Sequence, residues 1–260
     1  MRMTLEYSHV FLFLLVLTRM TGALLFNPFL GRRSVPAIAK MGLALLITVI
    51  VVPTINPPSI SFPTSLSFML ALVRELLLGY AMGLIMNLFS SWVLTAGEVM
   101  DMEMGLSVSK IYDPQSGVSM PVSGSVFNVM LTLIFFASGG HLTFLRILAD
   151  SMVTFPPGSG TLGLEIGGHL VAMLGNALIL SLKLGMPVLA IELLAEAGLG
   201  TLMRIVPQID VFSVGLQMKL AIGLIVVVLA LPPAARLMEA SLSQMFDQLQ
   251  KGIAIMLSTG

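Results

Sequence analysis

The stretch LLLGYAMGLIMNLFSSWVLTAG at residues 76–97 decides the class of fold. It contains no charged residue, and a helix needs only about 20 residues to cross a hydrocarbon core of about 30 Å. The whole chain of 260 residues is 57% hydrophobic and 10% charged, with a mean hydropathy of +1.00. Soluble domains carry about 25% charged residues, which solvate their surfaces. We therefore predict an integral membrane protein rather than a soluble enzyme.

Charge, cysteine and histidine usage exclude several classes of protein. Thirteen Lys and Arg balance thirteen Asp and Glu, and the chain has no basic run, which argues against nucleic-acid binding. The chain has no cysteine, so disulfides and thiolate chemistry are excluded. The histidines, His9, His141 and His169, have no metal-ligand spacing, and the sequence contains no nucleophile–base arrangement. We predict a protein that is not an enzyme and holds no metal or cofactor.

The first segment resembles a signal peptide but lacks a cleavage site. Basic Arg2 precedes an apolar core at residues 10–17, as in a secretory signal. Arg19 interrupts the segment directly after this core, and apolar residues resume at Ala23 without a small-x-small site. We therefore expect a retained hydrophobic helix.

Six apolar segments follow one another along the chain: 9–26, 37–53, 66–97, 124–149, 165–206 and 211–239. Several of them are too short or too interrupted for straight membrane spans. The uncharged runs at 166–182 and 220–235 are marginal in length, and residues 37–53 end in prolines, which interrupt helices. We predict an all-α, membrane-associated fold of tilted and broken helical hairpins that is buried in an assembly.

Seven charged residues lie within or at the edges of these segments: Arg19, Arg74, Glu75, Arg146, Lys183, Glu192 and Lys219. A charge at the bilayer centre costs about 2.5–3.5 kcal/mol on the insertion scale. Snorkelling at segment ends and pairing inside the protein are both open for most of them. Arg74 and Glu75 lie near the middle of a hydrophobic stretch and about 100° apart on a helix, so they do not face one another. Each needs another partner, and a neighbouring subunit is one source.

Two glycine motifs have ordinary explanations. GSGTLG at 158–163 matches the dinucleotide-binding pattern G-x-G-x-x-G. Prolines precede it, however, and Lys183 stands where an acidic residue is needed, so we interpret it as a flexible connector. Gly79 and Gly83 form G-x-x-x-G, which lets another helix approach closely but does not identify that helix.

Glu98, Asp101 and Glu103 form the one acidic cluster of the sequence. On a helix Glu98 and Asp101 share a face, so their carboxylates could bind a cation. A hydrated acidic end of a segment is the simpler interpretation, and we expect it.

The most informative irregular stretch is GLSVSKIYDPQSGVSMPVSG at residues 105–124. Loops of this length are uncommon in compact folds unless they are functional or disordered. The stretch nevertheless carries apolar residues that a solvated, disordered loop would avoid. We expect a loop of the re-entrant type, tucked into a pore or a partner's groove, since such backbone is tolerated at membrane depth only where protein or water surrounds it.

An ordered set of short motifs extends over nearly the whole chain: Arg19, Pro28, Pro36 and Lys40, then RELLLG (74–79), AGEVMD (96–101), MGLS (104–107), DP (113–114), GHL (140–142), FPPG (155–158) and PQIDVF (207–212). The set resembles the FliR family of flagellar type III export-gate membrane proteins, which is related to export-apparatus subunits of injectisomes. Two positions depart from the family pattern, which usually has Asn in place of Asp210 and Pro in place of Gln217. These departures affect local geometry more than family membership.

The resemblance implies a single FliR-like domain over residues 1–260. Residues 1–160 are expected to form a FliP-like part, and residues 161–260 a FliQ-like helical hairpin. The implied function is that of a structural, pore-forming subunit of the gate through which unfolded flagellar subunits leave the cytoplasm. The implied location is the bacterial inner membrane at the flagellar basal body. The implied partners are FliP and FliQ in a hetero-oligomeric gate, FlhB and FlhA, transient unfolded substrates and membrane lipid.

The resemblance also implies a role for the irregular stretch, because a FliR loop helps to close the pore of the gate. The plug is expected at residues 105–121, through Gly105, Leu106, Val108, Ile111, Tyr112, Asp113, Pro114, Gly117, Val118, Met120 and Pro121. The charges expected inside the membrane or at interfaces are Arg74, Glu75, Glu98, Asp101, Lys183, Glu192 and Lys219.

Two alternative functions stay open. An injectisome export-gate paralogue would have the same architecture and different cargo. A multi-pass secondary transporter would place a substrate site near Arg74 and Glu75, or near Lys183 and Glu192. Many carriers contain inverted repeats, and the sequence shows no convincing internal repeat.

Overall fold

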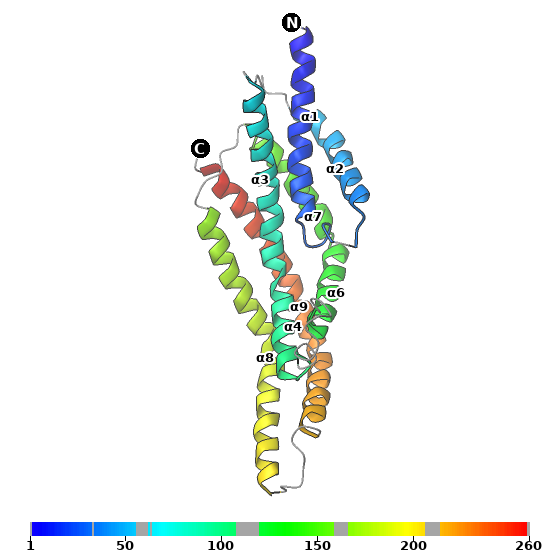
Figure 1. Ribbon diagram of the computed structural model, residues 1–260, viewed down its shortest axis with the longest axis vertical. Coiled ribbons are helices and arrows are strands. Elements are labelled where there is room, and N and C mark those ends of the chain that lie inside the picture. Colours follow the sequence, from blue (N-terminus) through cyan, green and yellow to red (C-terminus); the bar gives the residue numbers. More distant parts are fainter. Residues whose placement is uncertain are drawn as a thin grey trace. The chain divides into compact units, whose positions relative to one another are not determined.

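The computed structural model describes residues 2–32, 34–55, 62, 64–107, 120–158, 166–205 and 214–258. Across these residues the regular secondary structure is entirely helical, which confirms the predicted all-α class (Figure 1). A short 3₁₀ helix, η1 (Val52–Thr54), continues α2. The α-helices are α1 (Arg2–Leu25), α2 (Ala37–Val51), α3 (Ser65–Ser90), α4 (Trp92–Glu103), α6 (Val122–Ala137), α7 (Gly140–Thr154), α8 (Ile166–Ile205) and α9 (Leu216–Ser258).

The six apolar segments of the sequence correspond to these helices, and several of them are interrupted. The segment at 66–97 is divided at Ser91, between α3 and α4. The segment at 124–149 is divided next to Gly139, whose φ of 71° is readily adopted only by glycine. Pro53 lies in η1, where the segment at 37–53 ends. These breaks produce the interrupted helices that the segment lengths predict.

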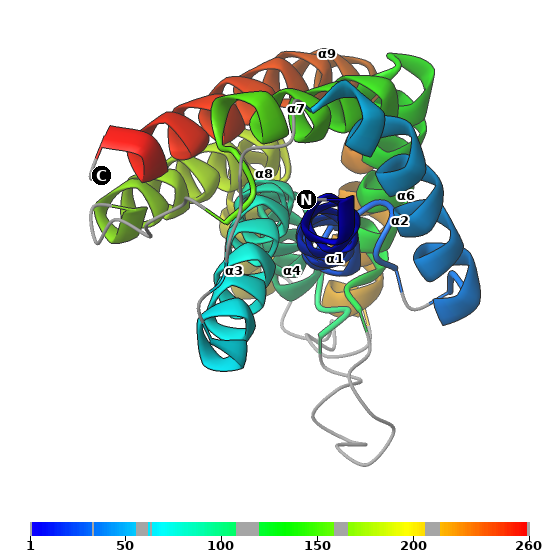
Figure 2. The same cartoon turned by 90° about the horizontal axis from the view of Figure 1, so that it is seen from above.

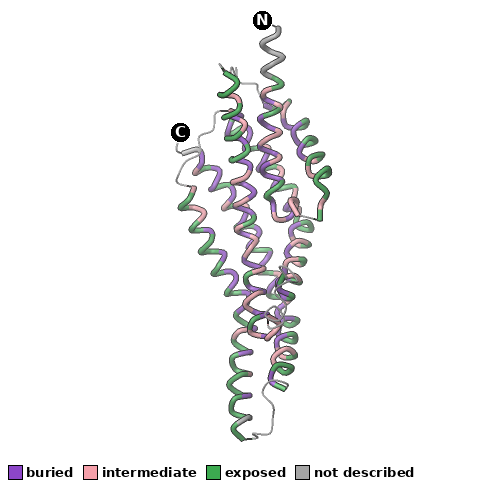
Figure 3. Tube along the Cα trace, viewed as in Figure 1, coloured by how far each residue is buried: buried purple, intermediate pink, exposed green. Residues whose placement is uncertain are grey.

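Four helical stretches of the described chain are long and apolar enough to cross a membrane: Ala37–Thr54, Ser65–Glu103, Ile166–Leu202 and Leu216–Met256. The bent pair α6 and α7 makes a fifth if it is one span. In each of the four stretches, at most 39% of the most apolar run of 18 residues is buried within the chain. Much apolar surface is therefore exposed (Figure 3). These properties are those of a membrane protein.

The chain forms two compact units, neither of which is one continuous segment. Unit 1 contains Met1–Ser90, Gly139–Leu174 and Ser243–Gly260. Unit 2 contains Ser91–Ser138 and Gly175–Leu242. The long helices α8 and α9 therefore contribute residues to both units.

In unit 1, α1 packs against α3 and α2, as two perpendicular views show (Figures 1 and 2). The contact with α3 is close because glycines leave room for it. A Cβ on Gly22 would lie 2.7 Å from the carbonyl oxygen of Leu76. Around this contact α1 supplies core side chains that are at most 1% exposed: Leu12, Leu15, Val16, Met20, Ala23 and Leu24.

In unit 2, α4 packs against α6, and the chain returns from α8 to α9 in the antiparallel direction (Figure 1). The two long helices meet where Lys219 of α9 reaches Glu196 of α8. Buried positions recur every three or four residues along α8, which is the spacing of one helix face. Ala177, Ser181, Leu184, Val188 and Glu192 are among them, and only the last of these five is ionisable.

Candidate functional site

A buried ion pair joins α1 to α3 in unit 1. Nε of Arg19 donates a hydrogen bond to Oε2 of Glu75 at 2.5 Å, and both side chains are 1% exposed. Nη1 of Arg19 donates to the carbonyl oxygens of Ser151 and Phe155, each at 3.1 Å. The second carboxylate oxygen of Glu75 accepts from the backbone N–H of Gly158 at 2.8 Å. The pair therefore ties α1, α3 and the end of α7 together.

The FPPG motif at 155–158 supplies backbone groups to this pair. The carbonyl of Phe155 accepts from Arg19 just beyond the C-terminus of α7, where the helix dipole favours a cation. Gly158 has a φ of 89°, so the turn that presents its N–H to Glu75 requires glycine. The motif thus gives the pair one acceptor and one donor.

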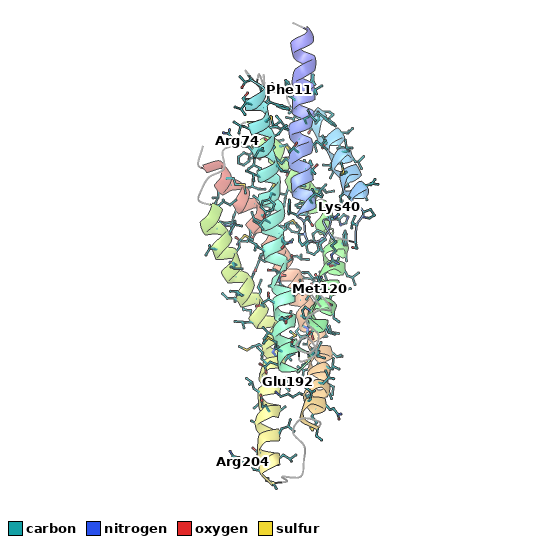
Figure 4. The ribbon with its side chains drawn as sticks, viewed as in Figure 1. Phe11, Lys40, Arg74, Met120, Glu192 and Arg204 are labelled. Atoms are coloured by element: carbon teal, nitrogen blue, oxygen red, sulfur yellow. The ribbon has the colours of Figure 1, made fainter. Side chains whose placement is uncertain are left out.

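Of the sources left open for the partner of Glu75, the structure provides one within the chain, Arg19, and not a neighbouring subunit. Removing one member of a buried pair leaves an uncompensated charge, which costs about 3–5 kcal/mol. Arg74, the preceding residue, is exposed and takes part in no ion pair of the described residues (Figure 4). Arg74 and Glu75, which are adjacent charges in one hydrophobic stretch of the sequence, therefore have different environments in the structure.

Two cavities lie beside the ion pair in unit 1. Nη2 of Arg19 has no hydrogen-bond partner among the described residues. The smaller cavity has a volume of about 10 Å³, enough for one water molecule, and is bounded by Arg19, Leu78, Met82, Ser151, Phe155, Ile253 and Met256. The larger, of about 230 Å³, is lined by Ile147, Asp150, Ser151, Thr154, Gln250, Ile253 and Ala254.

Gly79 and Gly83 lie on the side of α3 that faces α1. A Cβ on Gly79 would overlap the carbonyl oxygen of Arg19, and one on Gly83 would lie 2.9 Å from Cβ of Phe26. The helix against which this G-x-x-x-G motif packs is therefore α1 of the same chain.

Asp101 joins the two sides of the loop at 105–121 in unit 2. Its carboxylate oxygens accept hydrogen bonds from the backbone N–H groups of Val122 at 2.5 Å and Ser123 at 3.1 Å. The N-cap residue of α6, Pro121, provides no side-chain cap, so Asp101 caps the helix from α4. Asp101 is 1% exposed, so the expectation of a hydrated carboxylate is wrong for this residue.

We call the end of α4 and the start of α6, which flank the loop at 105–121, the stem of the loop. Glycines allow the two sides of the stem to pack closely. A Cβ on Gly97 of α4 would overlap the backbone of Gly124 in α6. Gly105, with a φ of 78°, packs against the side chain of Leu216 in α9. Three helices of unit 2 therefore contact the stem.

Four of the residues expected in the plug are described. Gly105 and Leu106 are half-buried, Pro121 is buried, and Met120 is 61% exposed. The others lie outside the described residues: Val108, Ile111, Tyr112, Asp113, Pro114, Gly117 and Val118. Of the acidic residues before the loop, Glu98 and Glu103 are half-buried.

The remaining predicted charges lie on α8 and α9. Glu192 is 0% exposed, and neither of its carboxylate oxygens has a hydrogen-bond partner among the described residues (Figure 4). A Cβ on Gly223 would lie 2.8 Å from Oε1 of Glu192, so this glycine makes room for the carboxyl group. Lys219, one turn before Gly223, pairs with Glu196 at 3.3 Å, whereas Lys183 is exposed.

The sequence alone does not link the residues that complete these sites. Arg19 and Gly158 belong to the same ordered set of motifs as Glu75, and this shared membership is the signal that could have linked them. Gly223 gives no such signal, because its role depends on the side chain that faces it. The described part of the chain contains no group of three or more His, Cys, Asp or Glu side chains placed to hold a metal ion.

Comparisons with known proteins cover most of the chain. Residues 10–245 match the family described as bacterial export proteins, family 1. The chain is 32% identical over 229 residues to the flagellar biosynthetic protein FliR of Escherichia coli (strain K12), a match that covers 85% of each protein. It is 31% identical over 223 residues to FliR of Bacillus subtilis (strain 168), covering 84% of this chain and 85% of the relative. With FliR of Aquifex aeolicus (strain VF5) the identity is 30% over 227 residues, covering 86% of this chain and 88% of the relative.

Proposed function

Because the chain belongs to the FliR family of bacterial export proteins and is a subunit of the flagellar type III export gate, we propose that it helps to form and to close the gate's channel. Its part in export is structural: it provides helices and a loop along the path of unfolded flagellar subunits and catalyses no reaction. The relatives are named as flagellar proteins, which favours flagellar subunits as the cargo over the cargo of an injectisome. The same names favour a gate subunit over a secondary transporter that acts alone.

The proposed assembly combines this chain with FliP and FliQ in the inner membrane of the basal body, beside FlhB and FlhA. Outward apolar surface supports the proposal, since side chains such as Ile38 (85% exposed), Leu194 (73%) and Leu229 (71%) need lipid or protein around them. The FliP-like part at 1–160 and the FliQ-like hairpin at 161–260 belong to the same proposal. The two long antiparallel helices α8 and α9 support the second part.

The loop at 105–121 is the proposed plug of the channel. The observation that carries this proposal is the stem of the loop, which Asp101 and the contact of Gly97 with Gly124 hold together. A plug must enter and leave a channel without loosening the subunit, and a fixed stem provides that property. The apolar residues of the loop would then seal the pore against water and ions.

Deleting residues 107–120 tests the plug. We expect membranes that contain the assembled gate with this deletion to leak small ions, whereas the unaltered gate holds an ion gradient. Replacing residues 159–164 with a Gly/Ser segment of equal length is the matched control, because this connector lies outside the proposed plug, and it should leave the membrane tight. Equal conductance of the deleted and unaltered gates would remove the plug assignment.

Purification tests the assembly. A tagged chain should retain FliP and FliQ in mild detergent and should be degraded or aggregated when produced without them. A stable, monomeric chain that needs no companion would contradict the proposal. Solute uptake by vesicles that contain this chain alone would favour the carrier instead.

A further inference from the structure

One N–H group of the buried ion pair in unit 1 has no acceptor among the described residues. The guanidinium of Arg19 carries five N–H donors and no acceptor. Its Nε donates to Glu75, and its Nη1 donates to the carbonyl oxygens of Ser151 and Phe155. Nη2 is buried as well, and no described residue accepts from it. Buried donors in folded proteins are nearly always paired, with protein or with ordered water, so Nη2 requires an acceptor.

The smaller of the two cavities beside the ion pair has room for such an acceptor. Arg19, Ser151 and Phe155 line it together with apolar side chains, and its volume of about 10 Å³ fits one water molecule and no larger ligand. A bound water molecule also needs acceptors for its own hydrogens. The carbonyl oxygens of Ser151 and Phe155 each have a second lone pair, and Oγ of Ser151, which donates to the carbonyl of Leu148, can still accept. The cavity therefore offers a water molecule one donor and several acceptors.

The larger cavity gives water a way to this position. Ser151 and Ile253 line both cavities, so these two side chains form the wall between them. The larger cavity, of about 230 Å³, is also lined by the exposed polar residues Asp150, Thr154 and Gln250. Polar walls of this kind hold water, whereas a purely apolar cavity stays dry. Water that enters the larger cavity is therefore separated from the smaller one by two side chains.

We propose that the smaller cavity binds one water molecule, which accepts a hydrogen bond from Nη2 of Arg19 and donates to the oxygens of Ser151 and Phe155. It enters from the larger cavity, past Ser151 and Ile253. The water completes the hydrogen bonds of the guanidinium, so it forms part of the contact that joins α1, α3 and the end of α7. This water site belongs to the interior of unit 1, so it does not depend on the role of the chain in the gate.

Radiolytic labelling tests whether the water is bound. X-ray radiolysis converts bound water into hydroxyl radicals, which oxidise a neighbouring methionine to its sulfoxide. Met82 and Met256 line the smaller cavity. The matched controls, Met86 and Met152, line neither cavity, and all four methionines are at most 2% exposed. In the full chain, purified in mild detergent with the subunits that it retains, we expect Met82 and Met256 to be oxidised at least about threefold faster than the controls. Equal rates at all four methionines, whether slow or fast, would overturn the proposal.

Cysteine accessibility tests the route of entry. The chain has no cysteine, so S151C places a single thiol of nearly the same shape in the wall between the cavities. S241C is the matched control: Ser241 is as buried as Ser151 (2% against 3% exposed), also donates to the carbonyl three residues before it, and lines neither cavity. A small water-soluble methanethiosulfonate should modify S151C at least about tenfold faster than S241C, since the reactive thiolate forms where water reaches the thiol. Equal rates would show that water does not reach the wall and would refute the proposed entry.

Discussion

Glu75 and Arg19 lie buried in unit 1, each held by the charge of the other. E75Q preserves the shape of the side chain but leaves the guanidinium buried without its counter-charge. We expect the variant to lose about 3–5 kcal/mol of stability and to melt at a lower temperature in detergent, as measured by circular dichroism. R74Q, which changes the exposed neighbour, should melt as the unaltered protein does. Equal melting temperatures for E75Q and the unaltered protein would show that the pair does not stabilise unit 1.

Glu192 is buried and, unlike Glu75, has no hydrogen-bond partner among the residues that the structure describes. A buried polar group without a partner destabilises the folded state, so E192M, which is similar in size and apolar, should raise the melting temperature. E196Q is the matched control, because it removes the ion pair between Glu196 and Lys219. The Glu196 side chain is 58% exposed, and such a pair stabilises the folded state by about 1 kcal/mol or less. A lower melting temperature for E192M would mean that a donor binds the carboxyl group in the folded protein.

At the scale of elements, glycine has opposite roles in different helices. A Cβ on Gly79 would overlap the backbone of α1, whereas a Cβ on Gly175 of α8 would meet nothing within 4 Å. G79A should therefore destabilise the contact between α1 and α3 by about 1–3 kcal/mol, the usual cost of overpacking. G175A should stabilise its helix by about 0.5–1 kcal/mol, because alanine favours helix more than glycine does. Thermal unfolding of G79A and G175A checks both predictions. Destabilisation of similar size in both variants would contradict the packing argument.

The cap that α4 provides for α6 is a second feature of this scale. D101A removes both acceptors from the first turn of α6, which should cost about 0.5–2 kcal/mol. We expect faster hydrogen exchange at the amides of Val122 and Ser123, because opening of the first turn then breaks no side-chain bond. D101N keeps one acceptor oxygen and should give an intermediate rate. Unchanged exchange in D101A would mean that the stem of the loop is held by other contacts.

For the whole molecule, the sequence predicts the class of fold because span length and apolar composition are local properties. The uncharged run at 76–97 indicates a membrane helix before any contact is known, and Pro53 marks the end of α2 in the same way. Lengths that are marginal for straight spans indicate broken helices, and the break at Gly139 agrees.

The sequence does not predict which charges meet, because that depends on how separate helices cross. Arg19 and Glu75 are 56 residues apart, and the contact that joins them depends on glycines at the crossing of α1 and α3. Asp101 looks like a hydrated carboxylate until α6 supplies two amides from the far side of the loop. The division into parts at 1–160 and 161–260 rests on resemblance alone and stays a prediction.

The interleaving of the two units has a consequence for synthesis on the ribosome. Unit 1 contains α1, α2 and α3, which are made before any of unit 2, yet it lacks Ser243–Gly260 until the last residue of unit 2 has been made. The early helices of unit 1 must therefore remain without some of their packing partners while all of unit 2 is made. A nascent chain stalled before residue 243 should be recognised and degraded by membrane proteases, even though most of its apolar segments are already in place.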